Sequence, residues 1–163
     1  MNSFSPVRLL AFAAAALVLE LTLLAHWAWA GARPDLLVPL VAFAALFAAE
    51  PSRALGSAWA IGLMRDLGTA GPLGQYALIY LVIAWSISSL RSLLFREHPL
   101  TQAAVGGVAA AIAGLASAAC TAAFAGGIPL GLVFARTFSS ALVTALLAPV
   151  AVTLLSRNRF LVR

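Results

Sequence analysis

The sequence predicts an all-α integral membrane protein with six transmembrane helices, the second and third of them short, and with both termini in the cytoplasm. Composition is the first reason. Of the 163 residues, 63% are hydrophobic and 9% are charged, whereas a soluble domain carries about 25% charged residues. Secondly, the apolar residues form runs long enough to cross a bilayer. Thirdly, the net charge of +5 comes from arginines placed singly between these runs, a pattern typical of membrane topology signals.

The apolar runs place the spans in a single transmembrane domain that covers residues 1–163. The first run contains Glu20 and is longer than the roughly 7–15 apolar residues of a signal peptide. We therefore interpret it as a retained first helix rather than a cleaved leader. The predicted spans lie at about residues 9–30, 36–49, 54–67, 73–91, 100–125 and 128–155.

The second and third spans depend on the Glu50-Pro51 step, because proline disfavours helix at the residue before it. Each piece is shorter than the about 20 residues of a usual spanning helix, so two short helices, a re-entrant hairpin or one broken helix are alternatives. Arginine positions favour two helices, since a single crossing would place the C-terminal arginines outside, against the positive-inside rule. With six spans the cytoplasmic arginines are Arg8, Arg53, Arg91, Arg96, Arg157, Arg159 and Arg163.

Two charged residues, Glu20 and Arg136, lie at matched depth in the first and last predicted spans. At 1.5 Å per residue, both would sit roughly 12–15 Å below the outer surface. A lone charge at the bilayer centre is costly, so we expect first an ion pair that joins the two helices. A polar cavity lined by both residues and a contact with a partner subunit are the alternatives.

Arg65 and Asp66 form the other charged position, directly before a glycine-rich turn at residues 68–74. Neighbouring residues on a helix diverge by about 100°, so the two side chains should not face one another. Gly74 is expected to help form a tight outer turn. The simplest interpretation is a helix-ending turn with a charge pair at the membrane interface; the alternative is that one side chain points into the bundle or toward a partner.

The fifth predicted span carries a small residue at every fourth position, and such a stripe lets another helix approach closely. Ser140, Thr144 and Ala148 form a matching series in the last span. We expect packing of the two helices against each other, with a subunit interface as the alternative. The stripe consists of Gly106, Ala110, Gly114 and Ala118.

The sequence carries no pattern typical of an enzyme. It has no nucleophile and base at catalytic spacing, no phosphate-binding glycine loop and no pair of catalytic carboxylates. Cys120 is the single cysteine, and no second histidine or cysteine stands at metal-ligand spacing. We therefore expect no catalysis, no cofactor and no metal site. Arginines that alternate with apolar runs also argue against nucleic-acid binding.

Several short motifs follow one another between residues 34 and 81. A Pro-Asp step precedes a leucine-rich short helix at Pro34-Asp35-Leu36-Leu37, and a Gly-Leu-apolar-x-Asp motif stands at Gly62-Leu63-Met64-Arg65-Asp66. They are followed by Leu73-Gly74, Ala77-Leu78 and Tyr80-Leu81. In this order the motifs resemble the MreD family of bacterial rod shape-determining proteins. Arg65 is a departure, since an apolar residue or glutamine is common there.

The resemblance implies a non-enzymatic scaffold subunit of the cell-elongation complex that builds peptidoglycan, located in the bacterial inner (cytoplasmic) membrane. Its partners would be MreC, the elongation synthase (a glycosyltransferase–transpeptidase pair), MreB filaments indirectly, membrane lipids and a second copy of the chain. The family is also similar in fold to the substrate-binding subunits of energy-coupling-factor vitamin transporters. That similarity gives the alternative, in which Glu20, Asp66 and Arg136 would line a ligand pocket near the outer face.

Overall fold

A computed structural model describes residues 5–24, 34–69, 71–92, 98–125 and 130–157. These residues form six α-helices, one π-helical segment and no strand, so the all-α prediction is confirmed for the described part of the chain. The elements are α1 (Pro6–Leu19), η1 (Glu20–Leu24), α2 (Leu37–Phe47), α3 (Pro51–Gly68), α4 (Gln75–Leu90), α5 (Pro99–Ala125) and α6 (Leu130–Arg157).

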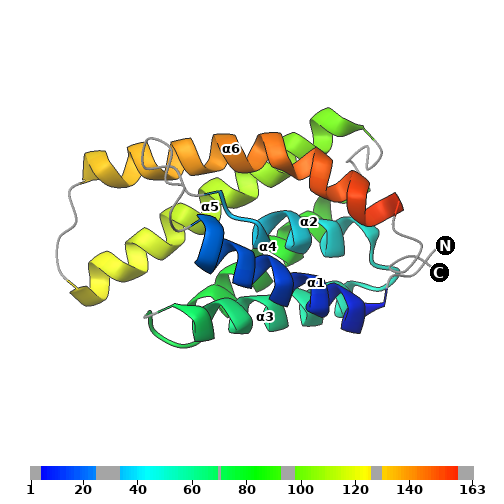
Figure 1. Cartoon of the computed structure of the whole chain (residues 1–163), viewed down its shortest axis with the longest axis horizontal. Helices are drawn as coiled ribbons and strands as arrows, with labels where there is room; N and C mark the ends of the chain where they lie inside the picture. The colour runs from blue at the N-terminus through cyan, green and yellow to red at the C-terminus, as the bar shows by residue number, and fades with distance from the viewer. Residues whose placement is uncertain (1–4, 25–33, 70, 93–97, 126–129, 158–163) are drawn as a thin grey trace.

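Successive helices run in opposite directions along the long axis of the molecule (Figure 1). The start of α1 and the end of α6 therefore lie at the same end of the bundle. Arg8, Arg53 and Arg91 belong to the helix ends gathered here, and we call this the cationic end. The turn between α3 and α4 lies at the opposite end. An even number of passes along the bundle agrees with termini on one side.

The core is built around α2, which contacts α1, α3, α4, α5 and α6. All residues from Leu37 to Leu46 are buried. A helix that is apolar on every face is stable only when it is surrounded, and this explains why the shortest α-helix occupies the centre. The longest helices, α5 and α6, pack side by side, and α3 packs chiefly on α4.

The predicted break at Glu50-Pro51 is present. Ala48 is extended after the end of α2, and α3 begins at Pro51, where a proline fits the first turn of a helix. The third helix thus starts three residues before the predicted boundary at residue 54. The first helix changes to π-helical geometry at Glu20, and residues 25–30 of the predicted first span lie outside the described residues.

By length and composition, two described helices can cross a membrane. These segments are Pro99–Ala123 in α5 and Val133–Leu155 in α6, while α2 and α4 are shorter apolar helices. Large apolar side chains are exposed on the outside of the bundle, among them Val7, Trp85 and Phe138. A surface of this kind suits hydrocarbon better than water.

Candidate functional site

Arg65 is the centre of a cluster of charged side chains that are mostly removed from solvent. It lies in the last turn of α3, and only 13% of its side chain is exposed. Its Nη1 is 2.6 Å from Asp35 Oδ1, and its Nη2 is 3.2 Å from Glu20 Oε1. One guanidinium thus holds two carboxylates, one from the end of the first helix and one from the segment before α2.

Two tyrosines of α4 complete this arrangement. Arg65 Nη1 donates a hydrogen bond to Tyr80 Oη at 2.8 Å, and Tyr80 Oη lies 3.4 Å from each carboxylate oxygen of Asp35. The guanidinium carbon of Arg65 is 4.5 Å from the centre of the Tyr76 ring, a distance at which a cation is attracted to a ring face. We call Arg65, Glu20, Asp35, Tyr76 and Tyr80 the Arg65 cluster.

Asp35 does more than balance the charge of Arg65. Its Oδ1 accepts hydrogen bonds from the N–H groups of Leu37 (3.1 Å) and Val38 (3.2 Å), at the start of α2. A carboxylate at this position satisfies free amides and complements the helix dipole. The N–H of Asp35 donates to Oγ1 of Thr144, a fully buried residue midway along α6. Asp35 therefore connects α2, α3 and α6.

Asp66 forms a separate structure, although it adjoins Arg65 in the sequence. Its side chain accepts hydrogen bonds from the N–H groups of Gly74 (3.0 Å), Tyr76 (2.9 Å) and Ala77 (3.1 Å). Gly74 has φ +92°, a left-handed conformation that favours glycine. Asp66 is only 2% exposed and caps the first turn of α4 from the preceding helix. The two neighbouring side chains diverge, as their helical spacing predicts.

Gly62 lets α3 and α4 come into direct backbone contact. A Cβ atom built on Gly62 would fall 2.6 Å from the nitrogen of Ala77, which is closer than two such atoms can approach. The amide N–H of Ala77 is also one of those that donate a hydrogen bond to Asp66. The close approach of the helices at Gly62 and the hydrogen bonds to Asp66 therefore involve the same turn of α4.

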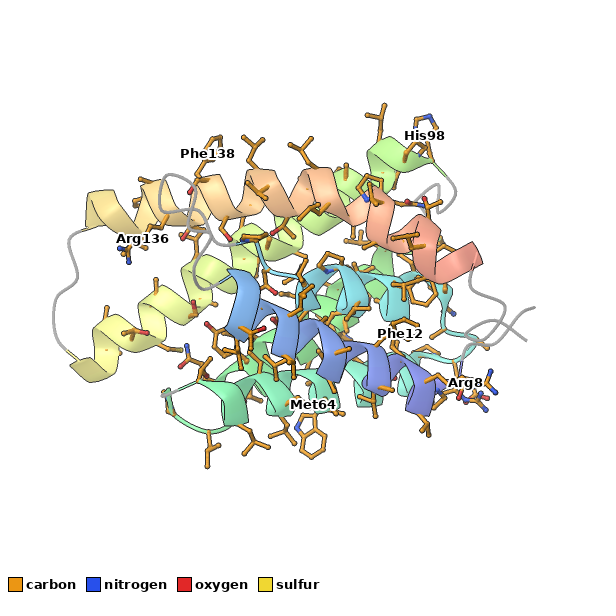
Figure 2. All side chains as sticks on the ribbon, viewed as in Figure 1. Arg8, Phe12, Met64, His98, Arg136 and Phe138 are labelled. Carbon is orange, nitrogen blue, oxygen red and sulfur yellow. The ribbon has the colours of Figure 1, made fainter. Side chains whose placement is uncertain are left out.

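The expected ion pair between Glu20 and Arg136 is wrong. Glu20 pairs with Arg65, whereas Arg136 is exposed near the start of α6, far from the cationic end marked by Arg8 (Figure 2). Arg65 and Asp66 do not pair with each other at an interface; both side chains are mostly buried, so the structure supports the alternative of a side chain that points into the bundle. Matched depth was a sound reason to seek a partner for Glu20, but it does not say which helix lies beside the first.

The structure adds residues that the sequence interpretation did not select. Tyr80 entered only as part of a family motif, and Thr144 only as a packing position, yet both bond to Asp35. The available signal was the set of arginines left away from the cytoplasmic side, since a basic residue inside a membrane bundle needs an acidic partner. Pro34, the other residue selected before α2, is buried.

The small-residue stripe of α5 faces α6 at two of its four positions. A Cβ built on Gly106 would meet Ala148 Cβ at 2.5 Å, and one built on Gly114 would meet Thr137 Cγ2 at 2.7 Å. Gly107, next to the stripe, approaches Ala145 in the same way. Ala110 is buried and Ala118 is half-buried.

The polar groups of this site hold helices together through ion pairs and hydrogen bonds. The charged atoms of Arg65, Asp35 and Asp66 bond to one another, to Tyr80 or to backbone amides. Among the described residues, no three His, Cys, Asp or Glu side chains group as metal ligands. Glu20 Oε2 and Arg65 Nε are buried and have no hydrogen-bond partner in the described part of the chain.

Comparison with known proteins identifies a family. The family model described as rod shape-determining protein MreD matches residues 3–157. Neither the search of curated proteins nor the search of solved structures returned a match.

Proposed function

Since the chain belongs to the MreD family of rod shape-determining proteins, we propose that it is a non-enzymatic scaffold subunit of the bacterial cell-elongation complex. In this proposal it spans the cytoplasmic membrane six times, with both termini in the cytoplasm. It binds MreC directly, associates with the glycosyltransferase–transpeptidase pair that synthesises peptidoglycan, and reaches MreB filaments through these partners.

The arrangement of charge supports this topology. Arg8, Arg53 and Arg91 share the cationic end, which the positive-inside rule assigns to the cytoplasm. Gln75 Nε2, beside the α3–α4 turn, donates to the carbonyl of Ser117 on α5. From Pro99 to Ser117, α5 rises about 27 Å, close to the roughly 30 Å of a bilayer core.

The use of the buried charges is the observation that carries the scaffold proposal. Arg65 binds Asp35 and Glu20, and Asp66 binds three amides of one turn. Groups bonded in this way fix the positions of the helices relative to one another. A rigid bundle with apolar outer faces is suited to hold other membrane helices.

A pull-down tests the proposal. The tagged full-length chain is extracted in detergent from its native membrane, and the bound proteins and small molecules are identified by mass spectrometry. Recovery of MreC and the elongation synthase, with no stoichiometric small molecule, is the expected result. A stoichiometric vitamin-like compound together with an ATPase module would overturn it in favour of a transporter subunit.

A matched pair of variants sharpens that test. Arg136→Ala removes an exposed arginine at the end of the bundle away from the cationic end, and Arg53→Ala removes one at the cationic end. A transporter subunit with its pocket near the outer face would lose its ligand with Arg136→Ala alone. The scaffold proposal expects no small molecule with either variant.

A further inference from the structure

An apolar groove between α4 and α5 is not used by the Arg65 cluster. Its volume is about 300 Å³, and its lining is apolar apart from Ser86, whose hydroxyl donates to the carbonyl of Val82 in its own helix. Such a surface offers no hydrogen bonds to water. The residues that the argument uses are Ile83, Ile87 and Leu90 on α4 and Ala104, Val108 and Ile112 on α5.

The size of the groove suits a hydrocarbon chain. Ile83 and Leu90 are seven residues apart on α4, so the groove extends for roughly 10 Å along the helix. At about 30 Å³ for a water-sized group, its volume corresponds to on the order of ten methylenes. A partner helix has a diameter of about 10–12 Å with its side chains and would not enter a space of this volume.

One end of the groove opens at the cationic end of the bundle. Leu90 is followed by Arg91, and the groove face of α5 continues back to His98, which is exposed at the start of that helix (Figure 2). Arg91 Nη1 donates to the carbonyl of Ala48 at 3.0 Å, which holds the guanidinium at the cationic end of the bundle.

Among the residues that the structure describes, basic side chains outnumber acidic ones at the cationic end. Glu50 is the one acidic residue at the cationic end among those that the structure describes, and Arg53 pairs with it at 3.5 Å. The other described acids, Glu20, Asp35 and Asp66, all lie in or beside the Arg65 cluster. The N-terminus of the 27-residue helix α5 adds the positive end of a helix dipole.

We propose that this groove binds one anionic glycerophospholipid of the cytoplasmic leaflet, with an acyl chain between α4 and α5 and the phosphate beside Arg91 and His98. The apolar groove would bind the acyl chain of such a lipid, and the basic residues at its mouth would bind the phosphate. The proposal concerns a ligand of the chain itself and does not depend on the scaffold role.

Photolabelling tests the proposal. The purified full-length chain is incubated in detergent with phosphatidylglycerol that carries a photoreactive group on its acyl chain, and the labelled peptides are mapped by mass spectrometry. We expect labelling concentrated on residues 83–90 and 104–112, and competition by unlabelled phosphatidylglycerol but not by phosphatidylcholine. Even labelling over all outward-facing helices, or equal competition by both lipids, would overturn the proposal.

Two sets of variants, one at alanines of α5 and one at arginines of the cationic end, separate a specific site from general attraction to lipid. Ala104→Leu fills the groove from an exposed position, and Ala119→Leu makes the same change at another exposed position of α5; only the first should reduce the labelling. Arg91→Gln should reduce phosphatidylglycerol retention about fivefold, the effect of one basic residue near a membrane surface. Arg91→Lys should restore it, and Arg53→Gln should leave it unchanged. Equal losses for both glutamine variants, or crosslinking of the groove to a protein, would contradict the proposal.

Discussion

The guanidinium of Arg65 lies 2.6 Å from the carboxylate of Asp35, although the two residues belong to opposite sides of α2 in the sequence. This contact joins the last turn of α3 to the first turn of α2, and through Thr144 to the middle of α6. Glu20 and Tyr80 attach α1 and α4 to the same guanidinium. The Arg65 side chain thus contacts residues of α4, of the end of the first helix and of the start of α2, and Asp35 extends these contacts to α6.

Replacing Arg65 should therefore be severe. Arg65→Gln leaves Glu20 and Asp35 in the bundle without their cation, and breaking a buried ion pair in this way costs about 3–5 kcal/mol of unfolding free energy. Arg65→Lys retains the charge, but one ammonium cannot reproduce the planar fork that reaches both carboxylates, so an intermediate loss is expected. Denaturant titration of the purified chain in detergent measures both.

Arg53→Gln is the matched control for this prediction. Arg53 also pairs with a glutamate, but 48% of its side chain and 63% of that of Glu50 are exposed. An exposed pair contributes less than about 1 kcal/mol. If Arg53→Gln and Arg65→Gln destabilise equally, the Arg65 cluster does not have the role assigned to it.

The two carboxylates of the cluster should differ in importance. Asp35 accepts from two backbone amides at the start of α2 as well as from Arg65, whereas Glu20 has one oxygen bonded to Arg65 and one without a partner. Asp35→Asn should cost roughly 1.5–3 kcal/mol, the value for hydrogen bonds to charged groups. Glu20→Gln should lower the free energy of unfolding by less, because the ion pair between Arg65 and Asp35 remains. The same denaturant titration decides, and an equal or larger loss for Glu20→Gln would reverse this ranking.

These contacts also show what the sequence could predict. The break at Glu50-Pro51 and the divergence of Arg65 from Asp66 follow from local rules, since proline geometry and the helical repeat act within a few residues. The depth expected for Glu20 is also a local inference, from the rise per residue. The ion-pair partner of Glu20 cannot be predicted in this way, because depth leaves open the rotation of each helix about its axis and the choice of neighbouring helix. The structure packs α1 against α3 and α2, and this places Glu20 beside Arg65.

Positions that look alike in sequence can also differ for reasons of packing alone. The sequence groups Thr144 with Ser140 and Ala148 as small residues facing α5. The carbonyl of Thr144 does lie close to Gly106 of α5, but its hydroxyl also accepts a hydrogen bond from the amide of Asp35. The π-helical turn at Glu20 is a further example. A π-helix is defined by a backbone hydrogen-bond pattern, and hydropathy does not record this pattern.

Asp66→Ala should loosen the start of α4. The substitution leaves the amides of Gly74, Tyr76 and Ala77 without their acceptor, and an unsatisfied buried donor costs about 1–3 kcal/mol. Amide hydrogen exchange at these three residues should accelerate, while exchange in the middle of α2 should not. Asp66→Asn retains one acceptor oxygen, so its exchange rates should lie between those of the unchanged protein and those of Asp66→Ala. If Asp66→Ala changes neither stability, nor recovery of partners, nor cell shape, the assigned role of Asp66 is wrong.

Two glycines of α3 provide a test of backbone contact between helices. At Gly62 a methyl group would fall 2.6 Å from the nitrogen of Ala77, so Gly62→Ala must push α3 and α4 apart. Overpacking of this kind costs typically about 1–3 kcal/mol. Gly56 lies on the same helix and nothing is within 4 Å of a Cβ built there. Gly56→Ala should instead stabilise the chain by up to about 1 kcal/mol through helix propensity. Opposite signs in the denaturant titration are expected; the same sign for both would mean that α3 and α4 do not meet at Gly62.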